Sequence, residues 1–178
     1  MHKDVESILI SEEKLENIVR KLARQIEADY QGREFIMVGL LKGSIVFMAE
    51  LMTKIDLDFE IDFMVASSYG GGTESSGKVR VLKDLEIDPK GKDILIVEDI
   101  VDSGNTLNFV MNHLISNGAN DVKVCTLCDK PGPRKVPLVP DYCGAEIPDE
   151  FIVGFGLDYD EKYRNLPYIG ILKRSVYE

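Results

Sequence analysis

The stretch Ile94–Leu107, ILIVEDIVDSGNTL, predicts a strand, a loop and a helix in direct succession. Its first four residues are apolar, which is typical of a strand buried on both faces of a sheet. The small polar turn Ser103–Thr106 has the composition that holds a phosphate where a strand passes into a helix. Glu98 and Asp99 lie just before this turn, although carboxylates repel phosphate. The stretch therefore predicts a ligand that carries both a phosphate and groups that carboxylates bind.

Strand and helix patterns alternate on both sides of this stretch. Residues 11–30 carry apolar side chains at helical spacing, with Ser11 as the N-cap and acidic residues in the first turn. Gly118 is placed to end the helix that follows the opening stretch. The predicted strands are 34–41, 59–69, 78–85, 93–99, 121–130, 150–158 and 167–173, and the predicted helices are 11–30, 44–55 and 105–118. This order predicts an α/β fold with a largely parallel sheet flanked by helices.

Length and charge narrow the class of protein. A chain of 178 residues, 44% of them hydrophobic, suits one domain that spans residues 1–178. The formal net charge of −10, with no basic block, argues against nucleic-acid binding. Apolar runs fall far short of the ~20 residues of a membrane span, and the first residues lack the apolar core of a signal peptide. We therefore expect a soluble cytoplasmic protein that does not bind membranes.

The three cysteines, Cys125, Cys128 and Cys143, are too few for a disulfide framework. The spacing of Cys125 and Cys128 allows a metal site to be considered. Against that, the surrounding VKVCTLC is β-prone, so that residues three apart should face opposite sides of a strand, and a second cysteine pair is missing. We expect buried structural thiols in a reducing compartment.

Four polar loops follow predicted strands, and their sequences are LKGS, EDIVDSGNT, DKPGPR and GLDYDEKYR. Ligands of α/β sheets bind beyond the carboxyl ends of the strands, so these loops should meet at one edge and form a site. None of them has the G-x-x-x-x-G-K-[ST] pattern of a P-loop. The glycines after strand 59–69 open no helix, so the dinucleotide-binding fingerprint also fails.

These motifs resemble those of the hypoxanthine-guanine phosphoribosyltransferase family, a branch of the type I phosphoribosyltransferases. The resemblance covers Leu41–Arg164 and rests on LKGS, SSYGGGTESSG, EDIVDSGNT and DEFIVGFGLDYDEKYRNLPYIG, in that order. The last motif is specific for the branch that acts on 6-oxopurines. The resemblance implies the type I phosphoribosyltransferase fold with a small hood formed by the terminal segments. It also implies a homo-oligomer, either a dimer or a tetramer.

The resemblance implies a substrate that resolves the conflict in the opening stretch. 5-Phosphoribosyl 1-pyrophosphate carries a 5′-phosphate, a ribose diol and a pyrophosphate that binds Mg²⁺. Glu98 and Asp99 would accept hydrogen bonds from the ribose hydroxyls and help to attract Mg²⁺, the expected cofactor. The residues that would hold the 5′-phosphate at the helix N-terminus are Ser103, Gly104, Asn105 and Thr106.

Asp102 is the candidate catalytic residue. In the family the matching aspartate lies by the five-membered ring of the purine, which must lose a proton as its nitrogen bonds to the sugar. The alternative is that Asp102 caps the following helix, because aspartate before Ser-Gly-Asn is a good N-cap. Both roles are compatible.

The pyrophosphate and its metal are assigned by the same resemblance. Lys42 and Gly43 match the pyrophosphate-binding loop, in which the peptide is often cis, although a Lys-Gly pair alone would be an ordinary turn. Asp158 matches a magnesium ligand, and Arg164 matches an arginine that reaches the pyrophosphate. Lysine and arginine supply here the local positive charge that an acidic protein otherwise lacks.

Three further residues match the purine-binding part of the family site. Lys130 would donate to the 6-oxo group, Phe151 would stack on the base, and Ile152 would present main-chain groups to its edge. Simple core packing is the alternative for Phe151 and Ile152. Ser68 and Tyr69 match residues of a lid, and the segment SSYGGGTESSG suits either a closing lid or a plain hairpin loop.

The predicted reaction is transfer of the phosphoribosyl group to hypoxanthine, and also to guanine, to give IMP or GMP and pyrophosphate. A xanthine-preferring enzyme is one alternative, because Lys130 recognises only the 6-oxo group. A regulatory phosphoribosyltransferase-like nucleotide-binding protein is another. A response-regulator receiver domain is a third, since ILIVED also resembles its acidic first strand, but too few residues follow Glu98 to complete that domain.

Overall fold

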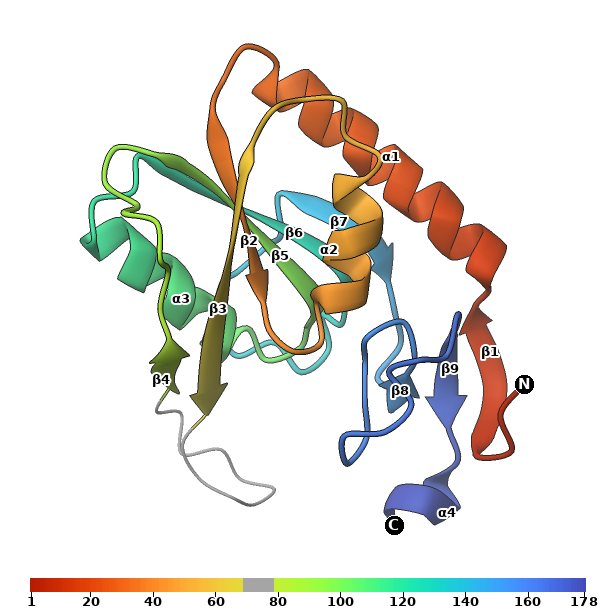
Figure 1. Cartoon of the computed structure of the whole chain (residues 1–178). Coiled ribbons are helices and arrows are strands. Elements are labelled where there is room, and N and C mark those ends of the chain that lie inside the picture. The colour runs from red at the N-terminus through yellow and green to blue at the C-terminus, as the bar shows by residue number, and fades with distance from the viewer. Residues whose placement is uncertain (69–78) are drawn as a thin grey trace.

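The centre of the molecule is a six-stranded sheet with the strand order β4-β3-β2-β5-β6-β7 (Figure 1). The computed structural model describes residues 1–68 and 79–178. All neighbouring strands in this sheet run parallel except β3 and β4, which are antiparallel. The strands are β2 (Phe35–Leu40), β3 (Glu60–Ser68), β4 (Val79–Lys83), β5 (Asp93–Val101), β6 (Asp121–Asp129) and β7 (Tyr142–Glu146). The prediction of a largely parallel α/β sheet is therefore confirmed.

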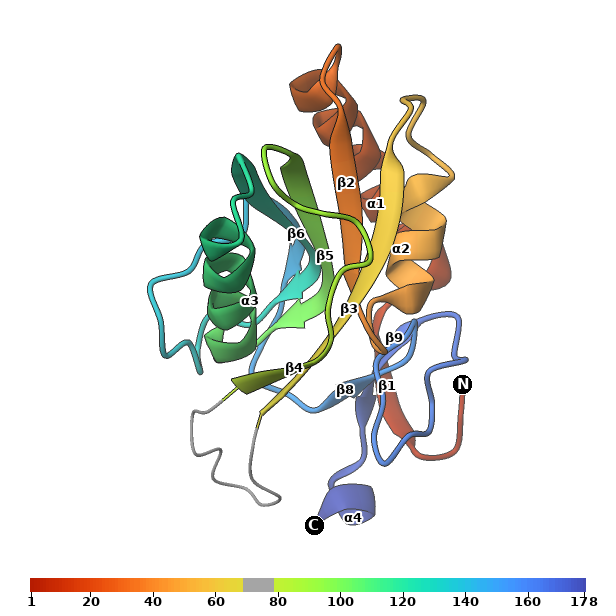
Figure 2. The ribbon, with the colours of Figure 1, turned by 60° about the vertical axis from the view of Figure 1, so that its left-hand side comes forward.

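Helices cover both faces of this sheet (Figure 2). Helices α1 (Glu12–Tyr30) and α2 (Ile45–Met52) lie on one face, and α3 (Asn105–Ser116) lies on the other. Side chains of successive β2 residues point to opposite faces of the sheet. Met37 packs with α1 and α2, whereas Ile36 packs with α3. All six residues of β2 are buried, as its unbroken apolar sequence predicts for a strand covered on both faces.

Local sequence signals determine the ends of the two longer helices. The Ser11 hydroxyl accepts the N–H of Lys14 at 3.4 Å and caps α1, as predicted. Helix α3 ends at Ser116, and Gly118, two residues further on, turns the chain away with a φ of +91° that suits glycine. There the N–H of Gly118 donates to Ile115 O and that of Ala119 donates to Leu114 O, which is the paired arrangement of a Schellman C-cap.

A second, smaller sheet joins the two ends of the chain. It has the order β1-β9-β8, made of β1 (Val5–Ile10), β9 (Ile169–Leu172) and β8 (Ile152–Val153), and both pairings are antiparallel. The short helix α4 (Arg174–Tyr177) follows β9. Val5, Val153 and Leu172 form the buried centre of this sheet. It is the hood of terminal segments that the family resemblance implied, and both termini lie beside it (Figure 1).

Several predicted boundaries were wrong or missing. The strand expected over 150–158 contains only Ile152 and Val153, because Gly154, Phe155 and Gly156 take positive φ values of 102°, 52° and 102° and turn the chain. Strands β1 and β7 and helix α4 were not predicted. Strand β1 has its partner at the opposite end of the chain, so no neighbouring sequence signals it.

The predicted burial of the cysteines is confirmed for two residues and only partly for the third. Cys125 and Cys128 are buried in β6, and their burial raises the pKa of both thiols. Cys143 is half-buried, and all three thiols are free. Within residues 1–68 and 79–178, no group of three or more His, Cys, Asp or Glu side chains is arranged to hold a metal ion. No helix in the same part of the chain is long and apolar enough to cross a membrane.

Candidate active site

The parallel strands β2, β5 and β6 end at the same edge of the sheet, and the predicted loops meet there. Two adjoining cavities open at this edge, with volumes of about 210 and 120 Å³. Gly43 lines the first, Ser103 and Gly104 line the second, and both cavities are lined by Glu98 and Thr106. The structure therefore brings the acidic end of β5 and the predicted phosphate turn to one continuous hollow.

The turn before α3 has the local geometry of an anion site. Gly104 occupies the N-cap position with a left-handed φ of 80°. A Cβ on Gly104 would lie 2.8 Å from Val136 Cγ2, so both its conformation and its close packing require glycine. Asn105 and Thr106 begin the helix, where the first N–H groups lack intrahelical partners and the helix dipole favours negative charge.

Asp102 is exposed at the rim of the second cavity. The hypothesis that it caps α3 is wrong, because Gly104 holds the cap position and no side-chain cap hydrogen bond is present there. Within the described residues, the Asp102 carboxylate has no hydrogen-bond partner, whereas its main-chain oxygen accepts the Nε–H of Arg134 at 2.9 Å. The backbone of Asp102 is thus fixed while its carboxylate is free to accept a proton from a ligand.

Glu98 and Asp99 at the end of β5 influence each other. Burial, and then the neighbouring Asp99, raise the pKa of Glu98 well above its ordinary range. Asp99 is buried against the loop after β2, and its Oδ1 accepts the N–H of Ile100 at 2.8 Å. Hydroxyl donors or a cation placed against this pair would favour its ionised form.

The loop after β2 packs directly on these acids. The Leu41–Lys42 peptide is cis, as the family resemblance led us to expect. Ser44 is fully buried and its hydroxyl donates to Leu40 O at 2.6 Å, which closes the loop on the end of β2. A Cβ on Gly43 would lie only 1.7 Å from Asp99 Oδ2, so glycine is required for this approach.

Asp158 and Arg164 belong to one loop that reaches the same edge. The Nη1 of Arg164 lies 3.0 Å from Asp158 Oδ1 and donates to Gly156 O at 2.8 Å. Gly156 in turn packs on the loop after β2, because a Cβ there would lie 2.1 Å from Gly43 O. The side chains predicted to serve pyrophosphate and metal are therefore brought to neighbouring loops.

Glu161 links the two predicted pyrophosphate cations. Its Oε2 lies 3.0 Å from the Nζ of Lys42 and 3.3 Å from the Nη2 of Arg164. Hydrogen bonds from Lys42 and Arg164 lower the pKa of Glu161. No motif or spacing in the sequence singles out this glutamate.

The residues predicted to hold the base lie where β6 ends and β8 begins. The Nζ of Lys130 lies 3.3 Å from Asp149 Oδ1, and the Lys130 side chain is 11% exposed. Phe151 is 38% exposed and its ring stacks on Tyr177 with centroids 5.0 Å apart, so the core-packing alternative does not describe it. The side chain of Ile152 does pack in the core, which leaves its main chain as the part available to a ligand.

Arg134 is a second residue whose role the sequence did not predict, although its loop, DKPGPR, was predicted to belong to the site. Besides Asp102 O, its guanidinium donates to Leu138 O and Val101 O and pairs with the Asp129 carboxylate. It therefore ties the phosphate turn to the loop that carries Lys130. A single arginine in a loop has no spacing pattern that would reveal such a role from sequence.

Two predicted lid residues, Ser68 and Tyr69, lie at the end of the first described segment and just after it. Ser68 ends β3, and its backbone pairs with Val79. Tyr69 and most of the predicted lid fall within 69–78, outside the described residues, so the lid remains a prediction.

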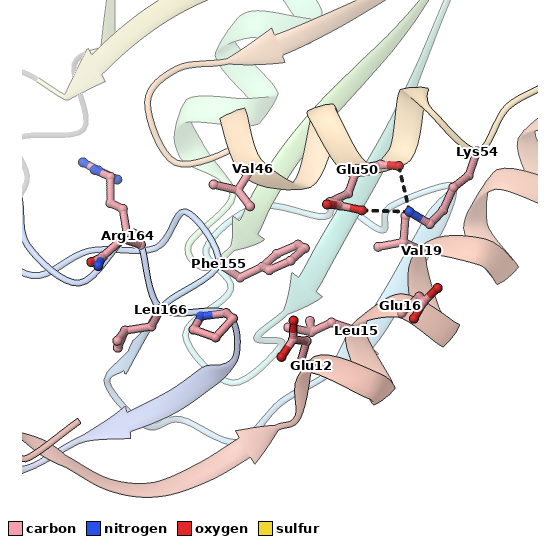
Figure 3. A pocket seen from close by; sticks show the side chains of 12 residues that line it. Glu12, Leu15, Glu16, Val19, Val46, Glu50, Lys54, Phe155, Arg164 and Leu166 are labelled. Atoms are coloured by element: carbon pink, nitrogen blue, oxygen red, sulfur yellow. Dashed lines mark hydrogen bonds and ion pairs between the residues drawn. The ribbon is translucent and has the colours of Figure 1, made fainter. Parts of the chain in front are cut away.

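A larger cavity of about 390 Å³ lies elsewhere, between α1, α2 and the loop 155–167 (Figure 3). Phe155 and Leu15 contribute apolar walls, and Glu50 is paired with Lys54 at 2.7 Å. The guanidinium of Arg164 points away from the other labelled side chains in Figure 3. This cavity includes neither the end of β5 nor the phosphate turn, so the chemistry indicated by the sequence belongs to the smaller hollow.

Comparison with known proteins agrees with this geometry. Residues 6–160 match the family model described as phosphoribosyl transferase domain. A protein of Staphylococcus epidermidis named hypoxanthine-guanine phosphoribosyltransferase is 51% identical over 177 residues, which cover 99% of both chains. The crystal structure of a hypoxanthine phosphoribosyltransferase from Staphylococcus aureus superposes with a TM-score of 0.96 at 49% identity, covering 100% of this chain and 97% of that one.

Another relative is longer than this chain. The bifunctional protein TilS/HprT of Listeria innocua is 50% identical over 177 residues, but these represent 99% of this chain and only 27% of that protein. The receiver-domain alternative is excluded, because the family model and the relatives cover its sequence motif with a different fold. The chain belongs to the hypoxanthine-guanine phosphoribosyltransferase family, within the type I phosphoribosyltransferases.

Proposed function

We propose that this protein transfers the phosphoribosyl group of 5-phosphoribosyl 1-pyrophosphate to hypoxanthine or guanine, releasing pyrophosphate and forming IMP or GMP. The observation that carries the proposal is the shared hollow in which Glu98 lies beside the phosphate turn Ser103–Thr106. Such a hollow suits a ligand with a terminal phosphate and a neighbouring diol. A relative that is 51% identical in sequence is named hypoxanthine-guanine phosphoribosyltransferase, which supports this activity.

The charge distribution of the site matches that substrate. The N–H groups at the start of α3 bind the 5′-phosphate, and Glu98 and Asp99 accept hydrogen bonds from the ribose hydroxyls. Lys42 and Arg164 bind the pyrophosphate. A protein with a formal net charge of −10 can thus hold a highly anionic substrate through a few local groups.

Proton transfer is assigned to Asp102. As the purine nitrogen bonds to the anomeric carbon, the base loses a proton and the bond to pyrophosphate breaks. The Asp102 carboxylate has no partner among the described residues and lies at the rim between the phosphate turn and the loop of Lys130. These features suit a general base better than they suit a regulatory binding protein, which has no need of a free carboxylate there.

The carboxylates of this edge suit Mg²⁺. The predicted ligands Asp158, Glu98 and Asp99 are hard oxygen donors, but within the described residues they do not form one ready-made metal cluster. Mg²⁺ is commonly held by one or two carboxylates together with substrate phosphates, which would complete its coordination here. When bound, the metal would neutralise charge on the leaving pyrophosphate. Arg164 holds the Asp158 side chain through its Nη1, which lies 3.0 Å from Asp158 Oδ1.

Base specificity provides the first test. Lys130 donates to the 6-oxo group of hypoxanthine or guanine, whereas adenine presents a donor at that position. Leaving a buried donor unpaired costs ~1–3 kcal/mol, so kcat/KM for adenine should be at least about ten- to a hundredfold below that for hypoxanthine. Steady-state assays with hypoxanthine, guanine, xanthine and adenine measure this order. Comparable values for adenine and hypoxanthine would reject the role of Lys130, and a clear preference for xanthine would favour the alternative substrate.

The dependence of turnover on Mg²⁺ provides the second test of the proposed function. Asp158→Asn keeps an acceptor for the Glu161 N–H, which Asp158 Oδ2 now accepts at 2.9 Å, but removes a charge from the proposed ligand set. We expect the Mg²⁺ concentration for half-maximal turnover to rise by about tenfold or more. Asp160→Asn, on the same loop, is the matched control and should leave that concentration unchanged. An unaltered Mg²⁺ dependence in Asp158→Asn would remove Asp158 from the metal site.

The remaining assignments extend this proposal. They comprise one catalytic domain over residues 1–178, a lid that includes Ser68 and Tyr69, assembly as a dimer or tetramer, and a cytoplasmic location without nucleic-acid partners. A size measurement in solution tests the oligomeric state directly.

A further inference from the structure

Glu161 is the residue from which we draw a new inference. One of its carboxylate oxygens, Oε2, contacts both Lys42 and Arg164, at 3.0 and 3.3 Å. These are the two cations that the proposed function assigns to pyrophosphate. The Glu161 side chain is 64% exposed, so it can leave this position without opening the core.

The backbone fixes Glu161 at this position. Tyr159 and Lys162 exchange both main-chain hydrogen bonds, at 3.2 and 3.0 Å, around a turn in which Asp160 and Glu161 have φ values of 51° and 61°. A turn with two left-handed central residues favours Gly, Asn or Asp, so glutamate at the second position is not selected by the turn itself. Unfavoured backbone conformations of this kind concentrate at functional sites. The Glu161 N–H also donates to Asp158 Oδ2 at 2.9 Å, which joins the turn to the proposed metal ligand.

The contacts do not suit a stabilising role. Lys42 is 67% exposed and Glu161 is 64% exposed, and ion pairs between exposed side chains add little to folding stability. These ion pairs affect ligand binding more than stability. Glu161 occupies the two cations, Lys42 and Arg164, and pyrophosphate must displace it before it can bind them.

We propose that Glu161 is a positioning residue that substitutes for pyrophosphate on Lys42 and Arg164 when the site is empty, and so promotes pyrophosphate release. This inference rests on the proposed function. The incoming pyrophosphate carries more charge than one carboxylate and displaces Glu161. After transfer, the return of Glu161 restores a partner to Lys42 and to the Nη2 of Arg164, whose Nη1 stays on Asp158 and Gly156 O throughout.

Glu161→Gln tests the proposal, with Asp160→Asn as its matched control. Both variants remove one negative charge from the same turn, but Asp160 pairs with Lys162, at 3.2 Å, and not with the pyrophosphate cations. Calorimetric titration with pyrophosphate in the presence of Mg²⁺ should show roughly three- to tenfold tighter binding to Glu161→Gln than to the parent, because two competing ion pairs are lost. Product inhibition by pyrophosphate should strengthen by the same factor during turnover, and the KM for 5-phosphoribosyl 1-pyrophosphate should fall.

The control variant and the possible contrary results distinguish failure of the Glu161 inference from failure of the proposed function. Asp160→Asn should bind pyrophosphate as the parent does, and the advantage of Glu161→Gln should shrink at high salt. Equal binding in parent and Glu161→Gln, or equal gains in both variants, would overturn the inference while leaving the enzyme activity intact. A lower Tm with weaker pyrophosphate binding in Glu161→Gln would show a structural role instead. A parent protein that binds neither pyrophosphate nor 5-phosphoribosyl 1-pyrophosphate would overturn the proposed function as well.

Discussion

Asp102→Asn is expected to lower turnover with hypoxanthine or guanine by about 10²- to 10⁴-fold, the usual contribution of a general acid or base. The substitution hardly changes the shape of the side chain, but an amide cannot take a proton from the purine. The backbone of Asp102 is fixed through Arg134, and its carboxylate is not the cap of α3. Stability and affinity for 5-phosphoribosyl 1-pyrophosphate should therefore remain close to those of the parent.

Turnover, Tm and substrate affinity should be measured on one preparation of this variant. Asp102→Glu serves as a second variant, because it keeps a carboxylate at a changed distance and should retain more activity than the asparagine form. Turnover of Asp102→Asn within a few-fold of the parent would assign proton transfer to Glu98, Asp99 or water.

Gly43→Ala is expected to reduce kcat/KM by about a hundredfold, the scale of loss when reacting groups are misplaced by ~1 Å. The added Cβ would lie 1.7 Å from Asp99 Oδ2 and 2.6 Å from its Cγ, so either Asp99 or the loop after β2 must move. Asp99 is proposed to bind the ribose and the loop to bind pyrophosphate, and either displacement disturbs the substrate. Steady-state kinetics with varied 5-phosphoribosyl 1-pyrophosphate measure the loss.

Gly132→Ala is the matched control, because among residues 1–68 and 79–178, its own chain neighbours aside, no atom lies within 4 Å of a Cβ built there. Gly132 is also exposed and belongs to a loop of the same sheet edge. The kcat/KM of Gly132→Ala should equal that of the parent. Near-parent activity in Gly43→Ala would mean that Asp99 adjusts freely and that its observed position does not matter for catalysis.

The parts of the fold that follow local rules could be predicted from the sequence. Helix α1 combines a serine cap with an apolar stripe, and both signals lie within its own residues. Strand β5 and the turn after it were identified for the same reason. The expected strand at 150–158 failed because its apolar residues suit a turn as well as a strand. The turn is decided by contacts from distant residues, such as the N–H of Phe155 donating to Leu166 O.

The site was predictable where a motif carries its chemistry and unpredictable where tertiary contact creates it. Three of the four predicted loops meet at one edge because they follow the parallel strands β2, β5 and β6. The fourth follows β8 of the antiparallel hood sheet and reaches the same edge through the packing of Gly156 on the loop after β2. Glu161, Arg134 and Asp149 were missed, since an acid or an arginine in a loop gains its role only from the partner that folding brings to it. The helix-capping role considered for Asp102 failed because helix α3 starts later than a cap at that residue would require.

The pairing of β1 with β9 has a consequence for how the protein acquires its site during synthesis. Val5 pairs with Leu172, so this strand pair must close a loop containing nearly the whole chain, at a large entropic cost. The proposed phosphate turn depends on β5, on α3 and on residues 134–136, which contact it, and all of these precede β9 in the chain. The segment proposed to bind the base, Phe151 and Ile152, instead adjoins β9 through pairing of Ile152 with Ile171. On this proposal, a nascent chain can form the turn that binds phosphate before β9 leaves the ribosome, whereas the proposed purine pocket is complete only after β9 has paired.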